Sequence, residues 1–328
     1  MSFAFNVDFE DFLKSNNNEY QFISTKKTQE FEYFILWLEE DSLYSLKSYD
    51  SNYLAFVNKF NQSRITSSKE NLKMWICEIY NKNEQRLLNS KIATSTFAIE
   101  NKLAHKHTTI ENNITTFQNG YLYKEEFGVS GIGMSKTEQS YKKLSFPVVK
   151  EPLLKRNFDF STLYYNESTY IYQNHVDDYF QYKGTTIGLN FNYFDWIDEY
   201  KNNTQKIKTK FFSSKNPMSI DSFLYQEDGE DKVYTLSEVN NRKTMGYCAL
   251  KLKEKIGSEY QYARLRLFRT KDLKEKFDHE RVYSQFDQKV IPLSPPDTVF
   301  VTFLLLEDSL GELNEIEDLL VSTFFKDF

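Results

Sequence analysis

The chain has 328 residues, of which 40% are hydrophobic and 17% aromatic, and its formal net charge is −6. This composition excludes a largely disordered chain, and the interspersed charges form no basic patch for nucleic acid or an anionic membrane. The length exceeds that of a typical single core, so two or three subdomains are expected.

No export signal or membrane span is expected. Acidic residues occupy Met1–Phe12, where a signal peptide needs a basic start and an apolar run. The longest apolar stretch, Val299–Leu306, is far shorter than the roughly 20 residues that cross a bilayer and is typical of a buried strand. Cys77 and Cys248 lie far apart in apolar settings and are expected to be buried free thiols. These features favour a cytoplasmic protein.

Residues 1–90 mix expected helices with apolar bursts, notably Tyr33–Leu38 and Met74–Tyr80. Short buried strands that alternate with helices are typical of an α/β unit with a partly parallel sheet. The sequence predicts such a unit here, and we find no motif for chemistry in it.

Lys91 lies at the expected start of a helix over Ile92–Lys102, for which Asn89 or Ser90 is the candidate N-cap. A cation in the first turn opposes the helix dipole unless an anion binds nearby. Lys91 is therefore a candidate anion-binding residue, with an ordinary exposed lysine as the alternative.

A strand ending at Lys124 leads into a glycine-rich loop. The chain has ten glycines, and three of them, Gly128, Gly131 and Gly133, fall close together here. Glycines let backbone amides approach phosphate oxygens, and a lysine adds a positive charge. The segment predicts a phosphate-covering loop, with a tight hairpin turn as the alternative; it matches neither a P-loop nor a Rossmann fingerprint.

An apolar connector that carries a proline, Pro152–Leu154, follows an expected strand over Phe146–Glu151. Such a connector can serve as a hinge whose backbone groups bind the edge of an adenine. Further strands are expected over Leu163–Tyr172 and, as a weaker pair, within Tyr179–Leu189. An amphipathic helix is expected over Phe191–Lys208.

The run Ser237–Arg242 follows an apolar alternation and carries a carboxylate, an amide and a guanidinium at alternate positions. Because side chains two residues apart share one face of a strand, Glu238, Asn240 and Arg242 are expected to point the same way. Carboxylate and amide oxygens suit hard divalent cations, and a guanidinium grips phosphate or carboxylate. The pattern indicates Mg-nucleotide chemistry, with a solvated strand edge as the alternative.

A second carboxylate, Asp221, lies on the expected preceding strand within Asn216–Tyr225. The loop Glu227–Asp231 is expected to return into the Glu238 strand as a β-hairpin with a long connection. Asp221 and Glu238 would then lie close enough to share a cation. The aspartates of the loop are rival ligands, but carboxylates at a turn tip are normally solvated.

The remaining chain predicts a helix over Lys243–Lys255, strands over Tyr262–Phe268 and Val299–Leu306, and a last helix from about Leu310 to Phe325. No internal repeat is found.

Taken in order, these motifs resemble those of the ATP-grasp superfamily. They are Asn89-Ser90-Lys91, Lys124 with its glycine loop, Lys150–Leu154, Asn216–Asp221 and Glu238–Arg242. The layout is similar to the biotin carboxylase and D-alanine:D-alanine ligase branches. It is most similar to uncharacterised ATP-grasp proteins with an E-x-N-x-R-x-x-M-G motif, which here ends at Gly246. The resemblance covers about residues 90–250.

The resemblance implies a mixed α/β and α+β fold, in which two α+β subdomains grip ATP behind a small Rossmann-like α/β domain. The implied domains are an N-terminal α/β domain over residues 1–90, a small subdomain with the glycine loop over 91–155 and a large subdomain with the metal site over 156–328.

The resemblance also implies roles for individual residues. Lys91 and Lys124 would contact the ATP phosphates, and Arg242 would steady the transferred phosphoryl group, so that Lys124 and Arg242 are the implied catalytic residues. The implied phosphate loop includes Gly128, Ser130, Gly131 and Gly133. The implied adenine and ribose contacts are Glu151, Pro152, Leu153, Leu154 and Asp159. The implied metal ligands are Asp221, Glu238 and Asn240, for two Mg²⁺ ions or, alternatively, Mn²⁺.

The implied activity is that of an ATP-dependent carboxylate-amine ligase, which phosphorylates a carboxylate and lets an amine displace phosphate. Phosphoryl transfer between anions needs cations and fixed positive donors rather than a protein nucleophile. A catalytically silent nucleotide-binding or scaffold protein and a small-molecule kinase on the same fold are the alternatives. Small-molecule acid and amine partners are expected, not nucleic acid or a membrane; the substrates and the oligomeric state stay open.

Overall fold

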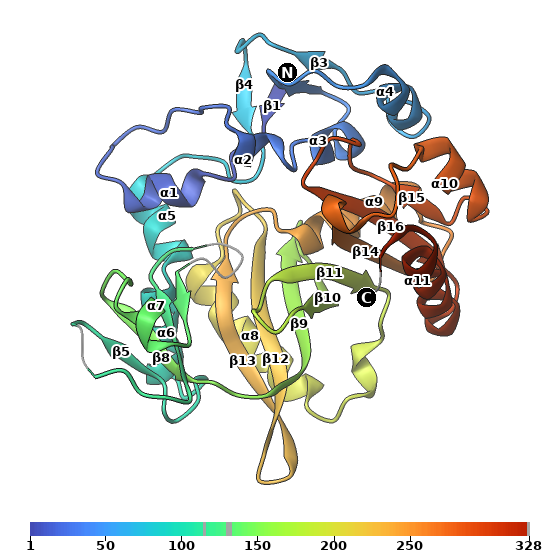
Figure 1. Cartoon of the computed structure of the whole chain (residues 1–328). Helices are drawn as coiled ribbons and strands as arrows, with labels where there is room; N and C mark the ends of the chain where they lie inside the picture. The colour runs from blue at the N-terminus through green and yellow to red at the C-terminus, as the bar shows by residue number, and fades with distance from the viewer. Residues whose placement is uncertain (114–115, 129–132, 327–328) are drawn as a thin grey trace.

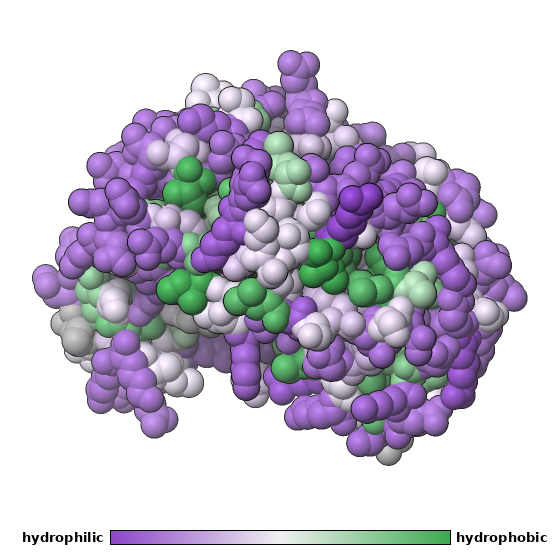
Figure 2. Space-filling model, turned by 90° about the horizontal axis from the view of Figure 1, so that it is seen from above, coloured by the Kyte–Doolittle hydropathy of each residue, from purple (hydrophilic) through white to green (hydrophobic). Residues whose placement is uncertain are grey.

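The computed structural model describes residues 1–113, 116–128 and 133–326, which are arranged around three β-sheets (Figure 1). Two of these sheets have four strands each, and the third has eight. Figure 2 shows that the face seen from above is largely hydrophilic, with separate apolar patches near its middle. No helix within the described residues is both long enough and apolar enough to cross a membrane.

The first sheet is parallel, with strand order β3-β2-β1-β4. Its strands are β1 (Ser2–Ala4), β2 (Ser42–Tyr44), β3 (Ile65–Thr66) and β4 (Leu72–Met74). The helices of this N-terminal unit are α1 (Phe9–Lys14), α2 (Lys26–Gln29), α3 (Tyr33–Leu38) and α4 (Ser51–Val57). A small α/β unit with a parallel sheet is therefore present, as the sequence predicts.

Neither apolar burst in this unit is the short buried strand that the sequence predicts. Tyr33–Leu38 is the helix α3, and five of its six residues are buried. A helix that is buried on nearly all sides shows no apolar periodicity, so its sequence cannot be told from that of a buried strand. Of Met74–Tyr80, only Met74 is in a strand; the backbone that follows is held by the side chain of Asn6, which accepts from the Ile76 N–H at 2.8 Å.

The second sheet is antiparallel, with strand order β5-β8-β6-β7. Its strands are β5 (Thr109–Glu111), β6 (Tyr121–Glu125), β7 (Met134–Ser135) and β8 (Val148–Pro152). The helices in this part of the chain are α5 (Lys82–Asn89), α6 (Lys91–Glu100) and α7 (Glu138–Tyr141). The helix expected after Lys91 and the strand expected around Lys124 are therefore both formed.

The third sheet is antiparallel, with strand order β13-β12-β9-β10-β11-β14-β16-β15. Its strands are β9 (Arg156–Tyr165), β10 (Ser168–Val176), β11 (Tyr182–Ile187), β12 (Met218–Glu227), β13 (Glu230–Asn240), β14 (Tyr262–Arg269), β15 (Val290–Pro292) and β16 (Phe300–Glu307). Its helices are η1 (Phe191–Tyr193), α8 (Ile197–Phe211), α9 (Met245–Ile256), η2 (Thr270–Asp272), α10 (His279–Gln285) and α11 (Leu310–Phe324). The three sheets thus occupy successive parts of the chain, while the domain boundaries after residues 90 and 155 stay predictions.

Turns in the third sheet differ from those predicted. The expected strand Leu163–Tyr172 is a hairpin, because β9 and β10 meet at Asn166 and Glu167, which both have positive φ. The expected long connection between β12 and β13 is a tight turn at Asp228 and Gly229, also with positive φ at both positions. Two successive residues with positive φ match the right-handed twist of paired strands. Asn and Asp tolerate this conformation better than other non-glycine residues. The turns are therefore indicated by these residue types and not by the spacing of apolar residues.

Two further elements are shorter than expected. Tyr179–Leu189 contains the single strand β11 rather than a strand pair, and the helix expected from Phe191 begins at Ile197, after the short 3₁₀ turn η1.

One apolar core joins the N-terminal unit to the third sheet. It contains α3 residues together with residues of α9, β14 and β16. Polar side chains tie the same parts together, since the Trp37 Nε1–H donates to the Leu293 carbonyl at 2.8 Å and Tyr33 contacts the hydroxyl of Thr302 at 2.5 Å. Cys77 and Cys248 are buried free thiols, as predicted.

The start of α9 lies directly against the third sheet. A Cβ atom added at Gly246 would overlap the ring of Tyr172 on β10. Only glycine therefore allows this approach of the helix to the sheet.

Candidate active site

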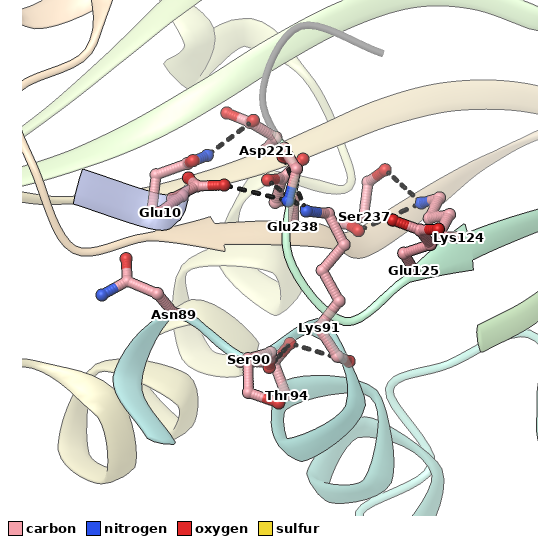
Figure 3. Close-up of polar contacts among 12 residues, drawn as sticks. Glu10, Asn89, Ser90, Lys91, Thr94, Lys124, Glu125, Asp221, Ser237 and Glu238 are labelled. Carbon is pink, nitrogen blue, oxygen red and sulfur yellow. Dashed lines mark hydrogen bonds and ion pairs between the residues drawn. The ribbon is translucent and has the colours of Figure 1, made fainter. Parts of the chain in front are cut away.

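Asp221 and Glu238 are direct neighbours across the β12–β13 pair. The ladder pairs Asp221 with Glu238 and Ser219 with Asn240, and a register shift follows Asp221. Cross-strand partners project on the same side of a sheet, so the two carboxylates share one face. Figure 3 shows them beside the side chain of Lys91.

A chain of polar contacts extends from Asp221 to the N-terminal unit. The Asn240 Nδ2 donates to Asp221 Oδ2 at 3.0 Å, and the Arg242 Nη2 donates to Asn240 Oδ1 at 2.5 Å. The Arg242 Nη1 forms an ion pair with Glu10 Oε1 at 3.0 Å, and Glu10 lies on α1. The motif residues are therefore brought together, and both ends of the Asn240 amide are engaged.

Lys91 is the first residue of α6, and its side chain is directed at the motif rather than at solvent. Ser90 is the N-cap, since its side chain accepts from the Ala93 N–H. Lys91 is 4% exposed, and its Nζ contacts Glu238 Oε1 at 3.1 Å and donates to the Gly128 carbonyl at 2.8 Å. The alternative of an ordinary exposed lysine is therefore excluded, and the unfavourable position at the helix start is offset by the partner carboxylate.

Lys124 occupies a second, separate ion pair. It lies on β6, is 1% exposed and contacts Glu151 Oε1 on β8 at 2.6 Å. Its Nζ also donates to the carbonyl and to the hydroxyl oxygen of Ser237, both at 3.2 Å. Glu151 in turn accepts from the Tyr234 hydroxyl at 3.0 Å. Lys124 thereby joins the second sheet to the segment that precedes Glu238.

Burial and the charge of Glu238 raise the pKa of Asp221 to about 6. A hydrogen bond from the Ser161 hydroxyl at 2.6 Å opposes this shift. The Ser161 oxygen accepts in turn from Asn174 Nδ2 at 2.6 Å, so β9 and β10 help to fix the carboxylate. Two carboxylates crowded in a poorly solvated place are an arrangement that a cation stabilises.

The donor set of this face fits Mg²⁺. Asp221, Glu238 and Asn240 offer only hard oxygen ligands, which Mg²⁺ and Mn²⁺ prefer. Among the described residues, no group of three or more His, Cys, Asp or Glu side chains is placed to hold a metal ion. Protein carboxylates alone would therefore leave the shell incomplete, as is usual where phosphate oxygens supply the remaining ligands.

The predicted adenine hinge borders a cleft of about 900 Å³. The cleft is lined by Leu153, Leu154 and Asp159, together with residues of β10, β11 and β14. Burial raises the pKa of Asp159, and an ion pair with Arg156 at 2.9 Å opposes that rise. Pro152 is the last residue of β8, and the Leu153 N–H donates to the Gly120 carbonyl at 2.8 Å, so this amide is already used in the structure.

The glycine loop connects β6 to β7. Gly133 has φ +76°, and a Cβ there would press against the Glu125 side chain, so a glycine is required. Both backbone polar groups of Gly128 are engaged, since its N–H donates to Glu10 Oε2 at 2.9 Å and its carbonyl accepts from Lys91. Ser130 and Gly131 lie outside the described residues.

Several residues of this site carry no sequence motif that indicates a role. Glu10 belongs to a six-residue helix far from the motif in sequence, and Ser161, Asn174 and Tyr234 lie in ordinary strand patterns. Only strand pairing and the packing of the N-terminal unit place them here. Ser237 directly precedes Glu238, so its proximity could have been foreseen.

No protein-family model matches the sequence, and no curated protein matches it either. Solved structures do match the fold. N5-carboxyaminoimidazole synthetase from Staphylococcus aureus, complexed with ADP, superimposes with a TM-score of 0.56 at 11% identity, covering 85% of this chain and 89% of that chain.

Two further structures match to a similar extent. L-amino acid ligase from Bacillus licheniformis has a TM-score of 0.56 at 10% identity, covering 91% of this chain and 97% of that chain. Biotin carboxylase from Campylobacter jejuni has a TM-score of 0.51 at 9% identity, covering 87% of this chain and 75% of that chain. These are ATP-grasp proteins, and the chain has the ATP-grasp fold, which confirms the resemblance at the level of the fold.

Proposed function

We propose that this protein is an ATP- and Mg²⁺-dependent carboxylate-amine ligase that acts through an acyl phosphate. The observation that carries the proposal is the meeting of two buried lysines, two carboxylates and one arginine where β12 and β13 face α6 and the second sheet. The ATP-grasp fold supports it, and the matched structures include an L-amino acid ligase.

The two lysines are proposed to bind the ATP phosphates. Both are buried and paired with carboxylates, Lys91 with Glu238 and Lys124 with Glu151. An anionic phosphate can replace a carboxylate as the partner of an ammonium group, and no buried charge is left unpaired where the displaced carboxylate finds another cation. Lys91 is suited to this exchange because Glu238 would turn to a cation at the same time.

Asp221, Glu238 and Asn240 are proposed to hold Mg²⁺, with Mn²⁺ as an alternative ion. When bound, the ion would neutralise charge that develops on the transferred phosphoryl group. The Asn240 amide would then exchange its contact with Arg242 for the ion, which frees the guanidinium.

The adenine is proposed to lie at Glu151–Leu154, beside the cleft of about 900 Å³, with Asp159 near the ribose. The phosphates would then extend along β12 and β13 towards Glu238. Gly128, Gly133 and the loop between them, which includes Ser130 and Gly131, are proposed to cover the phosphates.

The reaction has two steps. A carboxylate oxygen of the acid attacks the γ-phosphorus, the bond to the β–γ bridging oxygen breaks, and ADP leaves. The amine then attacks the acyl carbon, loses a proton and expels inorganic phosphate, forming a C–N bond. Arg242 is proposed to bind the equatorial oxygens of the transferred group, as a fixed positive donor does in phosphoryl transfer.

Product analysis tests this function. The purified protein is supplied with MgATP and mixtures of small carboxylic acids and amines, and ADP, phosphate and new amides are measured. A ligase releases ADP and phosphate only when acid and amine are both present. Phosphate retained on an acceptor would instead indicate a kinase, and absence of ADP with every mixture would favour a nucleotide-binding or scaffold protein.

Nucleotide binding is tested first by thermal unfolding with a non-hydrolysable ATP analogue and Mg²⁺. Ligand at about 100 times its Kd adds roughly 2.7 kcal/mol to the free energy of unfolding, which raises the midpoint by several degrees. An unchanged midpoint with every nucleotide contradicts the proposal.

A further inference from the structure

The carboxylate of Glu10 is held by two donors from different parts of the chain. Its Oε1 pairs with the Arg242 Nη1 at 3.0 Å, and its Oε2 accepts from the Gly128 N–H at 2.9 Å. Glu10 is 6% exposed, so these contacts replace most of its hydration. Figure 3 shows Glu10 close to Asp221 and Glu238.

The two donors have the character of an anion site. A guanidinium and a loop N–H are groups that commonly bind carboxylate or phosphate oxygens. One donor there is still unused, because the buried Arg242 Nε has no hydrogen-bond partner among the described residues. The Glu10 carboxylate therefore uses two donors and leaves a third, the Arg242 Nε, for a ligand with more oxygens.

Glu10 adds a third carboxylate to a region that already holds two. Asn240 links Arg242 to Asp221, and the neighbouring Lys91 is already paired with Glu238. An external anion that enters beside Arg242 would meet the negative charge of Glu10 as well. Such an anion and Glu10 therefore compete for the same donors.

We propose that Glu10 is an internal competitor: its carboxylate occupies an anion site formed by the Arg242 guanidinium and the Gly128 N–H, and an external carboxylate or phosphoryl group binds there by displacing it. On the proposed function, the displacing group is the carboxylate of the acid or its phosphorylated form. The N-terminal unit thereby keeps the site neutralised until an anion arrives.

The test measures the affinity of the Mg²⁺-free protein for inorganic phosphate and, separately, for acetate. Each Kd is obtained from thermal unfolding midpoints at constant ionic strength. Glu10→Gln keeps an oxygen for the Gly128 N–H but removes the charge that pairs with Arg242. We expect at least tenfold tighter binding of one or both probes than in the wild type.

Glu32→Gln is the matched control. Glu32 is also buried in the N-terminal unit, but its carboxylate accepts from Ser45 and Tyr49, outside the site. Its variant should bind both probes as the wild type does. Adding Arg242→Ala to Glu10→Gln should abolish the gain in affinity.

A Glu10→Gln protein that binds both probes no more tightly than the wild type overturns the proposal. If this variant does not fold, Glu10→Asp decides, because its shorter side chain cannot reach both donors; unchanged affinity in that variant also overturns the proposal. A gain for acetate alone assigns the site to a carboxylate, and a gain for phosphate alone assigns it to a phosphoryl group.

The assay needs neither nucleotide nor turnover. Failure to form ADP with any acid and amine would therefore count against the ligase function and leave this inference standing. Normal ADP formation with unchanged anion affinity in the Glu10 variants would count against this inference and leave the ligase function standing.

Discussion

Arg242 and Lys243 are consecutive cations that both pair with a glutamate of the N-terminal unit. Arg242 contacts Glu10, and Lys243 contacts Glu39 at 3.3 Å. The two pairs nevertheless lie in different surroundings. Arg242 joins the network of Asn240 and the glycine loop, whereas Lys243 borders a separate cleft of about 1100 Å³.

The surroundings of Lys243 are aromatic. Its ammonium lies 4.2 Å from the ring centre of Trp75 and 5.5 Å from that of Tyr247, and burial lowers its pKa. The Trp75 Nε1–H also donates to Glu39. A cation over aromatic faces with one carboxylate is a stable contact by itself. The comparison teaches that an ion pair with the N-terminal unit does not by itself indicate a site; the extra carboxylates and the loop amide around Arg242 are what distinguish the proposed one.

The largest difference in catalytic rate is expected between variants of Glu238, in the network around Arg242, and variants of Glu39, beside Lys243. Glu238→Ala removes a proposed metal ligand and leaves Lys91 without its carboxylate, so Mg-dependent ADP formation should fall by roughly 10³-fold or more. Glu39→Ala should leave the rate within a few-fold. Circular dichroism should show both variants folded, and turnover of Glu238→Ala at the wild-type rate would disprove the metal assignment.

Variants of Arg242 and Lys243 should differ almost as clearly in kcat. Arg242→Met removes the proposed donor to the transferred group and should lower kcat by about 10²- to 10³-fold with a smaller change in KM for ATP. Lys243→Met keeps the packing of the stem and should change kcat little. Equal losses in steady-state kinetics would show that the two regions act together rather than separately.

Lys124 is expected to affect binding more than the motif residues do. Lys124→Met removes a proposed phosphate contact and should weaken the affinity for a non-hydrolysable ATP analogue by about tenfold, measured by calorimetry. Lys251→Met is the control, because Lys251 lines the separate cleft beside Lys243, and this variant should bind the analogue normally. Unchanged affinity in Lys124→Met would place the phosphate site elsewhere.

The smallest expected effect is a pH dependence of Mg²⁺ binding at the site around Arg242. The pKa of Asp221 is raised to about 6, so Mg²⁺ at the proposed site would have to displace a proton below that pH, and its affinity should fall towards tenfold per pH unit as the pH drops from 6 to 5. Without the ion, the folded state holds this proton between about pH 4 and 6, so this group makes folding less favourable as the pH rises through that range. Asp221→Asn should flatten the Mg²⁺ titration, and an unchanged slope would rule out Asp221 as the titrating group.

The sequence allowed much of the local structure around the site to be predicted. Capping by Ser90 placed Lys91 in a first turn, and strand alternation placed Asp221 beside Glu238. These features depend on neighbours in the chain or on one hairpin, and short-range patterns carry them.

The rest depends on contacts between distant segments. The run Tyr33–Leu38 has no periodicity that separates a buried helix from a strand, and the turn at Asp228 depends on backbone angles rather than on apolar residues. Glu10 reaches Arg242 only because the N-terminal unit packs on the third sheet. No pattern within α1 could have indicated that contact.

The close approach of α9 to β10 has a consequence for how sequences of this kind are compared. Gly246 ends the E-x-N-x-R-x-x-M-G pattern, yet the space around it is limited by the Tyr172 side chain on β10. A glycine at this position of the pattern would therefore reflect the short distance between helix and sheet. In a saturation library, substitutions at Gly246 should be depleted by selection for folded protein alone, even under conditions in which catalysis is not required, whereas substitutions at Glu238 should be depleted far more strongly under selection for activity than under selection for folded protein.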